Sequence, residues 1–292
     1  MFHLKAVIMR NILVPTDFSD NATNALEYAI ALFKYDISAF FIMHAYQDAI
    51  YADAEKVTRA NLPEITNKVA NQSTAKLETL LAYVNKISQN PRHTYHIISS
   101  NNVLVDGVDN IVDEQNIDII VMGTRGFTNN KQIAFGSHTL QVLKYVQCPV
   151  LVIPENYKYT QPKHIVFPTN YLIPYKRREL KLLCEMACPY RAEIDVVYIS
   201  QSDKLSLRQQ DNRDFIKDVL YKNPLNFKTI KAKNVANTIQ NYIAEKGIDM
   251  LVMVNSRHSF LENMLLQSTI DKMSLHLAIP FFVLQNINRD TL

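Results

Sequence analysis

The chain has 292 residues, of which 48% are hydrophobic, and its 31 basic and 28 acidic residues give a net charge of +3. This length and apolar content suffice for two cores of about 100 to 150 residues each. The longest apolar stretches fall well short of the roughly 20 residues that a membrane-spanning helix needs. So weak a positive charge does not indicate a nucleic-acid-binding face. The composition therefore favours a protein with neither a membrane nor a nucleic-acid partner.

The N-terminal residues MFHLKAVIMRN lack the apolar region and small-residue cleavage site of a secretory signal peptide. The cysteines Cys148, Cys184 and Cys188 cannot all pair, and an odd count fits a reducing compartment. Both features predict a cytoplasmic protein. Cys184 and Cys188 fall on one expected helix, where two small buried hydrophobic side chains are favoured over a metal-binding or redox pair.

Short apolar runs rich in β-branched residues alternate with longer amphipathic stretches, a pattern typical of βαβ units around a parallel sheet. In the first half, the expected strands are residues 11–15, 38–45, 93–98, 117–122 and 149–153. The expected helices between them are residues 20–34, 61–88, 103–115 and 136–146. The residues TDFSD supply an N-cap for the first helix, and Ser137 lies in the first turn of the last. The second half repeats the strands at 164–168, 193–199, 226–231, 248–254 and 280–285.

The second half is a copy of the first. IDIIVMGTRGFTNNKQIAFGSHTLQVLKYVQCPVLVIP from Ile117 aligns without a gap with IDMLVMVNSRHSFLENMLLQSTIDKMSLHLAIPFFVLQ from Ile248, at a constant offset of 131 residues (248 − 117). The halves also begin alike, with NILVPTDFS from Asn11 and HIVFPTNYL from His164. The chain is therefore a tandem duplication, with expected domains at residues 1–154 and 163–292 joined by the polar stretch PENYKYTQPK.

Residues 121–139, VMGTRGFTNNKQIAFGSHT, hold three of the five glycines in the chain. Glycine averages about 7% of globular sequence, or roughly 20 residues in a chain of this length, so five is a clear shortfall. Each glycine that is present is therefore expected to meet a need for positive φ or for close backbone approach. The stretch leaves the fourth strand, crosses a loop and enters a helix at Gly136, which is where ligands bind in open α/β sheets. A helix N-terminus offers unpaired N–H groups, so a phosphate is expected against residues 136–139, aided by the Ser137 and Thr139 hydroxyls.

The spacing G-x2-G-x9-G-S matches neither the dinucleotide-binding nor the P-loop fingerprint. It resembles the universal stress protein family, in the subgroup whose members bind ATP. The resemblance rests on ILVPTDFS, IMHAY, DIIVMGTRG, GSHT and CPVLVIP, and it covers essentially the whole chain as two consecutive family domains. It implies an α/β fold of two tandem Rossmann-like, adenine-nucleotide-hydrolase-like domains, each a five-stranded parallel sheet of order 3-2-1-4-5 flanked by helices.

Carried over residue by residue, the resemblance implies a nucleotide site in the first half. Asp17 lies beside the adenine and Ala45 near the base, whereas Met122 and Gly123 approach the base and ribose. The predicted nucleotide-binding residues are Pro15, Thr16, Asp17, Ala45, Met122, Gly123, Arg125, Gly126, Gly136, Ser137, His138 and Thr139, of which the last five hold the phosphates. The implied ligand is ATP, with Mg²⁺ left open. Turn formation is the alternative role for the glycines and for Asp17, and His44 is interpreted as structural.

The second half departs from this pattern at every one of these points. Val254, Arg257 and Gln267 replace the three glycines, and Asn170 stands where Asp17 does. We expect this half not to bind ATP in the family manner and to be structural or regulatory. Ser268 is retained, and Arg257 with His258 leaves open some other anion, although a purely structural domain is favoured.

These features predict a cytoplasmic stress-response protein that binds ATP through its first domain, with no catalytic residue and no metal site. A slow ATPase is the main alternative, although the loop has no Walker lysine and its candidate carboxylates besides Asp17 are Asp20, Asp48 and Glu55. A nucleotide-free scaffold for protein partners is the third. The apolar stretches 148–154 and 279–285 predict that the halves pair through their fifth strands as a pseudo-dimer, with a further homodimer left open.

Overall fold

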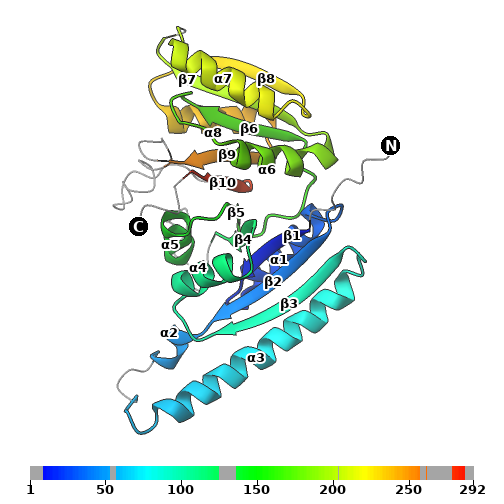
Figure 1. Cartoon of the computed structure of the whole chain (residues 1–292), viewed down its shortest axis with the longest axis vertical. Helices are drawn as coiled ribbons and strands as arrows, with labels where there is room; N and C mark the ends of the chain where they lie inside the picture. Colours follow the sequence, from blue (N-terminus) through cyan, green and yellow to red (C-terminus); the bar gives the residue numbers. More distant parts are fainter. Residues whose placement is uncertain are drawn as a thin grey trace.

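The structure, a computed structural model, describes residues 9–52, 57–124, 136–202, 204–256, 261 and 278–286. Its described strands form one sheet of ten, in the order β3-β2-β1-β4-β5-β10-β9-β6-β7-β8 (Figure 1). Each half contributes five parallel strands in the order 3-2-1-4-5, as the resemblance implied. Helices cover both faces of the sheet, so the central strands are buried and almost continuously apolar.

The strands of the first half are β1 (Arg10–Pro15), β2 (Ser38–Ala45), β3 (His93–Ser100), β4 (Ile119–Gly123) and β5 (Val150–Ile153). Its helices are α1 (Asp20–Leu32), α2 (Gln47–Ile50), α3 (Leu62–Ile87), α4 (Leu104–Glu114) and α5 (Ser137–Tyr145). The strands of the second half are β6 (His164–Thr169), β7 (Glu193–Ser200), β8 (Leu225–Lys231), β9 (Met250–Asn255) and β10 (Phe281–Gln285). Its helices are α6 (Arg177–Ala187), α7 (Leu207–Val219) and α8 (Val235–Lys246), and the 3-10 turn η2 (Cys188–Tyr190) follows α6. All the predicted elements are present within a few residues; the single turn α2 was not predicted.

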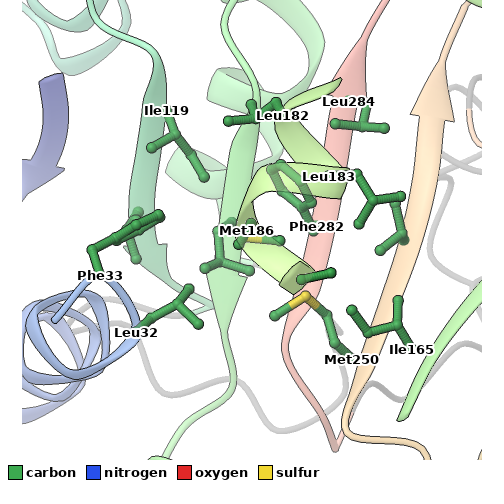
Figure 2. Close-up of a cluster of buried hydrophobic side chains, with 14 of the residues drawn as sticks. Leu32, Phe33, Ile119, Ile165, Leu182, Leu183, Met186, Met250, Phe282 and Leu284 are labelled. Carbon is green, nitrogen blue, oxygen red and sulfur yellow. The ribbon is translucent and has the colours of Figure 1, made fainter. Parts of the chain in front are cut away.

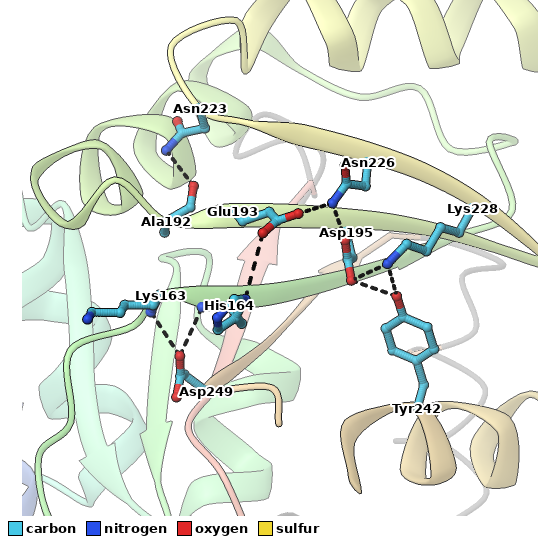
Figure 3. Close-up of polar contacts among 10 residues, drawn as sticks. All are labelled: Lys163, His164, Ala192, Glu193, Asp195, Asn223, Asn226, Lys228, Tyr242 and Asp249. Atoms are coloured by element: carbon cyan, nitrogen blue, oxygen red, sulfur yellow. Dashed lines mark hydrogen bonds and ion pairs between the residues drawn. The ribbon is translucent and has the colours of Figure 1, made fainter. Parts of the chain in front are cut away.

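An aspartate at equivalent positions in the two halves, Asp118 or Asp249, hydrogen-bonds the start of the first strand of that half. Asp118 Oδ2 accepts a hydrogen bond from the N–H of Asn11 at 2.9 Å. In the second half, Asp249 Oδ2 accepts from the N–H groups of Lys163 and His164, each at 2.9 Å (Figure 3). A carboxylate that accepts backbone N–H groups makes strong, charge-assisted bonds. The aspartate shared by IDIIVM and IDMLVM is therefore structural.

The two halves join where β5 pairs with β10 in antiparallel register. Val150 lies opposite Val283, Leu151 opposite Phe282, and Val152 opposite Phe281. All these side chains are buried. The predicted pairing of the fifth strands within the chain is thus confirmed, and each half covers the apolar sheet edge of the other.

One hydrophobic core runs across this junction. Leu32 and Phe33 at the end of α1, together with Leu183 and Met186 of α6, belong to the same buried cluster as Phe282 of β10 (Figure 2). A second cluster on the opposite face extends from α4 and α5 to α8 in the same way. The halves consequently share both cores and do not pack as separate beads.

Polar contacts reinforce the junction around the end of α1. The Tyr190 hydroxyl donates to the carbonyl of Leu32. Arg10 forms ion pairs with Asp36 of the first half at 3.0 Å and with Glu185 of the second at 3.5 Å. Because the last carbonyls of a helix have no intrahelical donor, the second half completes the hydrogen bonding of α1.

A buried ionic group also connects the outer strands of the second half to α8. Asp195 on β7 accepts hydrogen bonds from Lys228 Nζ at 2.8 Å, Tyr242 Oη at 2.6 Å and Asn226 Nδ2 at 2.9 Å (Figure 3). Burial acts to raise the pKa of this carboxyl, but the three donors outweigh burial and lower it. Both oxygens of the Asp195 carboxylate thus accept hydrogen bonds, and the bond from Tyr242 holds α8 against the sheet.

The cysteine prediction is only partly correct. Cys148 and Cys184 are buried, but Cys188 is exposed. Helix α6 ends at Ala187 and the chain continues as the turn η2, so Cys188 does not stay on the buried face that Cys184 occupies. No helix among the described residues is long and apolar enough to cross a membrane.

Glu179 makes stability depend on pH. It is 5% exposed in the first turn of α6, and its Oε2 has no hydrogen-bond partner among the described residues. Burial raises the pKa of Glu179 to about 7 from its ordinary value of 4.5, although Lys176 and Arg178 oppose the shift. The folded state therefore binds this proton more tightly than the unfolded state, so stability is full below about pH 4.5 and falls as the pH rises to about 7.

We predict that Glu179→Gln raises the free energy of unfolding at pH 8 by about 2 to 3 kcal/mol, because the neutral amide avoids burying a charge. Urea denaturation between pH 5 and pH 8 measures this as a flatter stability profile. Glu64→Gln, an exposed carboxylate in the first turn of α3, is the matched control. An equal pH slope in wild type and Glu179→Gln would contradict the prediction.

Candidate functional site

A cleft opens at the carboxyl ends of β1, β2 and β4 in the first half. Strands β1 and β4 are neighbours in the sheet, so the cleft lies at the point where the strand order reverses. It encloses about 610 Å³ when the open solvent at its mouth is included. It is lined by Pro15, Thr16, Asp17, Ala22, His44, Ala45, Asp48, Leu104, Met122, Gly123, His138 and Thr139.

This lining contains most of the residues predicted from the sequence. Gly136 and Ser137 are absent from it but begin α5 directly before the lining residues His138 and Thr139. Arg125 and Gly126 lie outside the described residues, as does Glu55. The sequence did not indicate Ala22 or Leu104. They are apolar helix residues, and only the docking of α1 and α4 turns them towards the strand ends.

The turn after β1 is held by side chains of its own residues. Thr16 Oγ1 accepts from the N–H of Phe18 at 3.0 Å, and Asp17 Oδ1 accepts from the N–H of Ser19 at 3.0 Å and from its hydroxyl at 2.6 Å. Ser19 is in turn the N-cap of α1, accepting from the N–H of Ala22 at 3.2 Å. Asp17 is therefore a turn residue as well as a cleft residue, and its carboxylate lies near the positive end of α1.

The second half builds the same turn without the charge. The N–H of Tyr171 donates to Thr169 Oγ1 at 2.9 Å, and the N–H of Leu172 donates to Asn170 Oδ1 at 2.9 Å. Phe18 and Tyr171 share a left-handed backbone, with φ of 64° and 56°. Since an amide oxygen supports this turn equally well, the fold does not require a carboxylate at Asp17.

Gly123 allows α1 to approach the end of β4 closely. A Cβ added to it would lie 2.4 Å from Asn21 Nδ2 of α1, which is closer than real Cβ contacts. Its φ is not in the left-handed region, where Gly247 alone is found among the described glycines. The glycine therefore lets α1 come down onto the end of β4 at the floor of the cleft.

The N-terminus of α5 faces the same strand end. The N–H of Gly136 donates to the Thr124 carbonyl at 2.6 Å, and the Thr139 hydroxyl donates to the Gly123 carbonyl at 2.9 Å. The first N–H groups of a helix, here those of residues 137–139, have no intrahelical partner. Among the described residues no side chain caps them either. Thr139 is 3% exposed, and its hydroxyl proton is already used within the protein.

His44 forms one wall of the cleft and is oriented from behind. Its Nδ1 lies 2.8 Å from Ser73 Oγ of α3, which accepts from the Ser99 hydroxyl at 2.7 Å. Its ring packs against Phe18 with 4.5 Å between ring centroids. Burial lowers the pKa of His44, Lys76 lowers it further, and Asp17 opposes them. The imidazole is therefore neutral at pH 7, which agrees with a structural role.

The corresponding positions in the second half carry larger side chains. Val254 occupies the position of Gly123 at the end of β9 and is 4% exposed. The register of β7 puts Ile199 where Ala45 lies on β2. The hydroxyl of Tyr175 is hydrogen-bonded to that of Thr169 in a buried position. Arg257, His258, Gln267 and Ser268, which the sequence singled out, lie outside the described residues.

Comparison with known proteins agrees with this architecture. The sequence profile of the universal stress protein family matches residues 9–154 and 200–285. The chain belongs to the universal stress protein family.

Two curated universal stress proteins each match about half of this chain. Universal stress protein MJ0577 of Methanocaldococcus jannaschii is 27% identical over 164 residues, covering 51% of this chain and 96% of the relative. Universal stress protein YxiE of Bacillus subtilis is 23% identical over 147 residues, covering 50% of this chain and 99% of the relative. The crystal structure of a universal stress protein from Archaeoglobus fulgidus covers 94% of this chain and 96% of its own, with a TM-score of 0.64 and 15% identity. That likeness shows a shared fold over both halves of this universal stress protein.

We predict that Asp17→Asn leaves this universal stress protein folded and lowers its free energy of unfolding by no more than about 1 kcal/mol, the helix-dipole contribution of the lost charge. Asn170 makes the equivalent hydrogen bond at 2.9 Å, so the turn survives. Chemical denaturation measures the change. The control Asp17→Ala removes the acceptor, and a loss with Asp17→Asn as large as with Asp17→Ala would contradict the prediction.

Proposed function

We propose that the first half binds ATP and that the second half does not. The observation that supports this most directly is the cleft at the switch point of the first half, because predicted residues from three strand ends line it beside the uncapped N-terminus of α5. A site of this kind combines an apolar slot with a place for negative charge.

The lining divides into two chemical regions that suit the two ends of a nucleotide. Ala45, Leu104 and Met122 provide an apolar wall against which a flat base can pack. Among the described residues, Ser19 donates to Oδ1 of the Asp17 carboxylate, which leaves Oδ2 as an acceptor for the base. The N–H groups in the first turn of α5, which no described side chain caps, and the positive end of the helix dipole are the natural place for phosphates. The Thr139 hydroxyl already donates to the Gly123 carbonyl.

We assign the second half a structural or regulatory role in the same protein. Its turn after β6 is intact, but Val254 and Ile199 place branched side chains where the first half has Gly123 and Ala45. We further propose that the protein acts as a cytoplasmic stress-response protein, on the basis of its odd number of cysteines and its family.

Slow hydrolysis of ATP is a weaker proposal than binding. Phosphoryl transfer depends on neutralising the charge that develops on the phosphates and on positioning a water molecule. The described lining contains no lysine or arginine, and of its carboxylates Asp17 is engaged by Ser19 whereas Asp48 is exposed. Among the described residues no three His, Cys, Asp or Glu side chains gather as a metal-binding group.

We predict one ATP per chain. Isothermal titration calorimetry of the purified, nucleotide-stripped protein should give a single site, and ATP at 100 times its Kd should stabilise the fold by about 2.7 kcal/mol. The physical reason is that the cleft with Gly123 in its lining occurs in the first half, whereas the second half has the buried, branched Val254 at that position. Two equivalent sites, or no heat and no thermal shift, would each reject the proposal.

We predict that Gly123→Val weakens ATP binding about tenfold to hundredfold in a protein that still folds. The new side chain would collide with Asn21, 2.4 Å from the built Cβ, so α1 and the cleft residues Asp17 and Ala22 at its start would have to shift. Gly247→Ala is the matched control: Gly247 has a φ of 61° at the end of α8 with nothing within 4 Å of its built Cβ.

Alanine at position 247 costs about 1 kcal/mol of backbone strain far from the cleft, so it should lower stability and leave the Kd for ATP unchanged. Calorimetry on both folded variants separates the two effects. Unchanged affinity in Gly123→Val would show that this glycine serves only the packing of α1.

A further inference from the structure

Helix α5 of the first half runs from the candidate site to the junction with the second half. Its N-terminus is fastened to the end of β4 by Thr139 and Gly136, beside the candidate site. Its last turn contains Leu143, whose side chain is fully buried in the core shared by both halves. The helix has nine residues, so the two ends are about 13 Å apart.

Two buried amide side chains of the second half hold the C-terminal end of α5. Asn255 Nδ2 donates to the Leu143 carbonyl at 3.2 Å, and Gln285 Nε2 donates to the same oxygen at 3.1 Å. Asn255 Nδ2 also lies 2.9 Å from Gln285 Oε1, which accepts from it. The two residues are 5% and 7% exposed and lie side by side at the ends of β9 and β10.

The Leu143 carbonyl needs these donors. It is one of the last four carbonyls of α5, which have no intrahelical N–H partner, and a buried carbonyl without a donor is costly. Water is excluded from this oxygen's surroundings because both amides are buried. The position of the C-terminal end of α5 is thus set by the second half.

The first half has no such amides at the equivalent sequence positions. At the offset of 131 residues that relates the halves, Asn255 and Gln285 correspond to Thr124 and Pro154. Neither of these carries a side-chain amide, and proline carries no N–H either. The two amides are therefore particular to the half that has lost the glycine motif.

We propose that the second half positions the ligand-facing end of α5 through Asn255 and Gln285 and thereby sets the affinity of the site in the first half. This inference rests on the proposed function, because the ligand at that end is the phosphate group of ATP. A helix held at both ends presents its N–H groups in a fixed direction, so less ordering is needed when the ligand binds. The degenerate half thus acts as the regulatory half.

The test compares Asn255→Ala with a control variant, Asn223→Ala, which removes a buried amide that does not contact α5. Asn223, in the same half, is also buried and donates through Nδ2 to the Ala192 carbonyl at 3.3 Å (Figure 3). Asn223→Ala therefore removes a similar hydrogen bond and disturbs the second half alone. Gln285→Met, which keeps the side-chain volume and removes the donor, serves if Asn255→Ala does not fold.

Two measurements are made on the full chain of each variant. Calorimetry with ATP should show a Kd weaker by about three- to tenfold in Asn255→Ala and Gln285→Met, the worth of one typical hydrogen bond, and an unchanged Kd in Asn223→Ala. Amide hydrogen exchange without ligand should be faster by a similar factor at residues 140–146 in the first two variants only.

The outcomes separate this inference from the proposed function. If wild type binds no ATP, the proposed function fails, and the exchange measurement still decides whether the amides anchor α5. If wild type binds ATP and both α5 variants bind it equally well, the inference fails while the proposed function stands. An equal loss of affinity in Asn223→Ala would also overturn it, because general destabilisation of the second half would then explain the effect.

Discussion

In each half one edge of the parallel sheet is a strand, β5 or β10, whose paired residues are apolar and whose outer backbone groups have no partner within that half. The antiparallel pairing of these two strands satisfies those groups and buries both faces of the junction at once. Because the pairing brings the ends of α1 and α6 together, Leu32, Phe33 and Met186 complete a core that neither half closes alone (Figure 2). The same pairing brings β9 and β10 against α5, so the geometry of the site depends on it too.

The duplication separates what the fold requires of both halves from what differs between them. Both halves keep the left-handed residue and the side-chain hydrogen bonds of the turn after the first strand, so this turn is a demand of the fold. Only the first half keeps a glycine at the end of the fourth strand, where Val254 fills the equivalent space. The glycine of the first half leaves room for Asn21 of α1, so this difference concerns how the first helix packs on the fourth strand.

The strands and much of the candidate site could be predicted because their signals are local. Apolar runs, the cap at Ser19 and the spacing of the glycines are properties of a few consecutive residues. The remaining lining residues have no such signal: Ala22 and Leu104 resemble any apolar helix residue until α1 and α4 dock on the sheet. Cys188 was misassigned for a related reason, since helical spacing from Cys184 holds only while the helix continues. The single turn α2 is too short to show a period.

The sequence by itself determined the duplication, the positions of the strands, the family resemblance and which half carries the glycine motif. These follow from residue types at fixed spacings, which the chain carries whether or not it is folded. Only the tertiary structure decided that Gly123 makes room for Asn21, that the Thr139 hydroxyl bonds the Gly123 carbonyl, and that Asn255 and Gln285 hold α5. Asn255 and Leu143 are 112 residues apart, and such contacts depend on how helices pack against a twisted sheet, which no local pattern records.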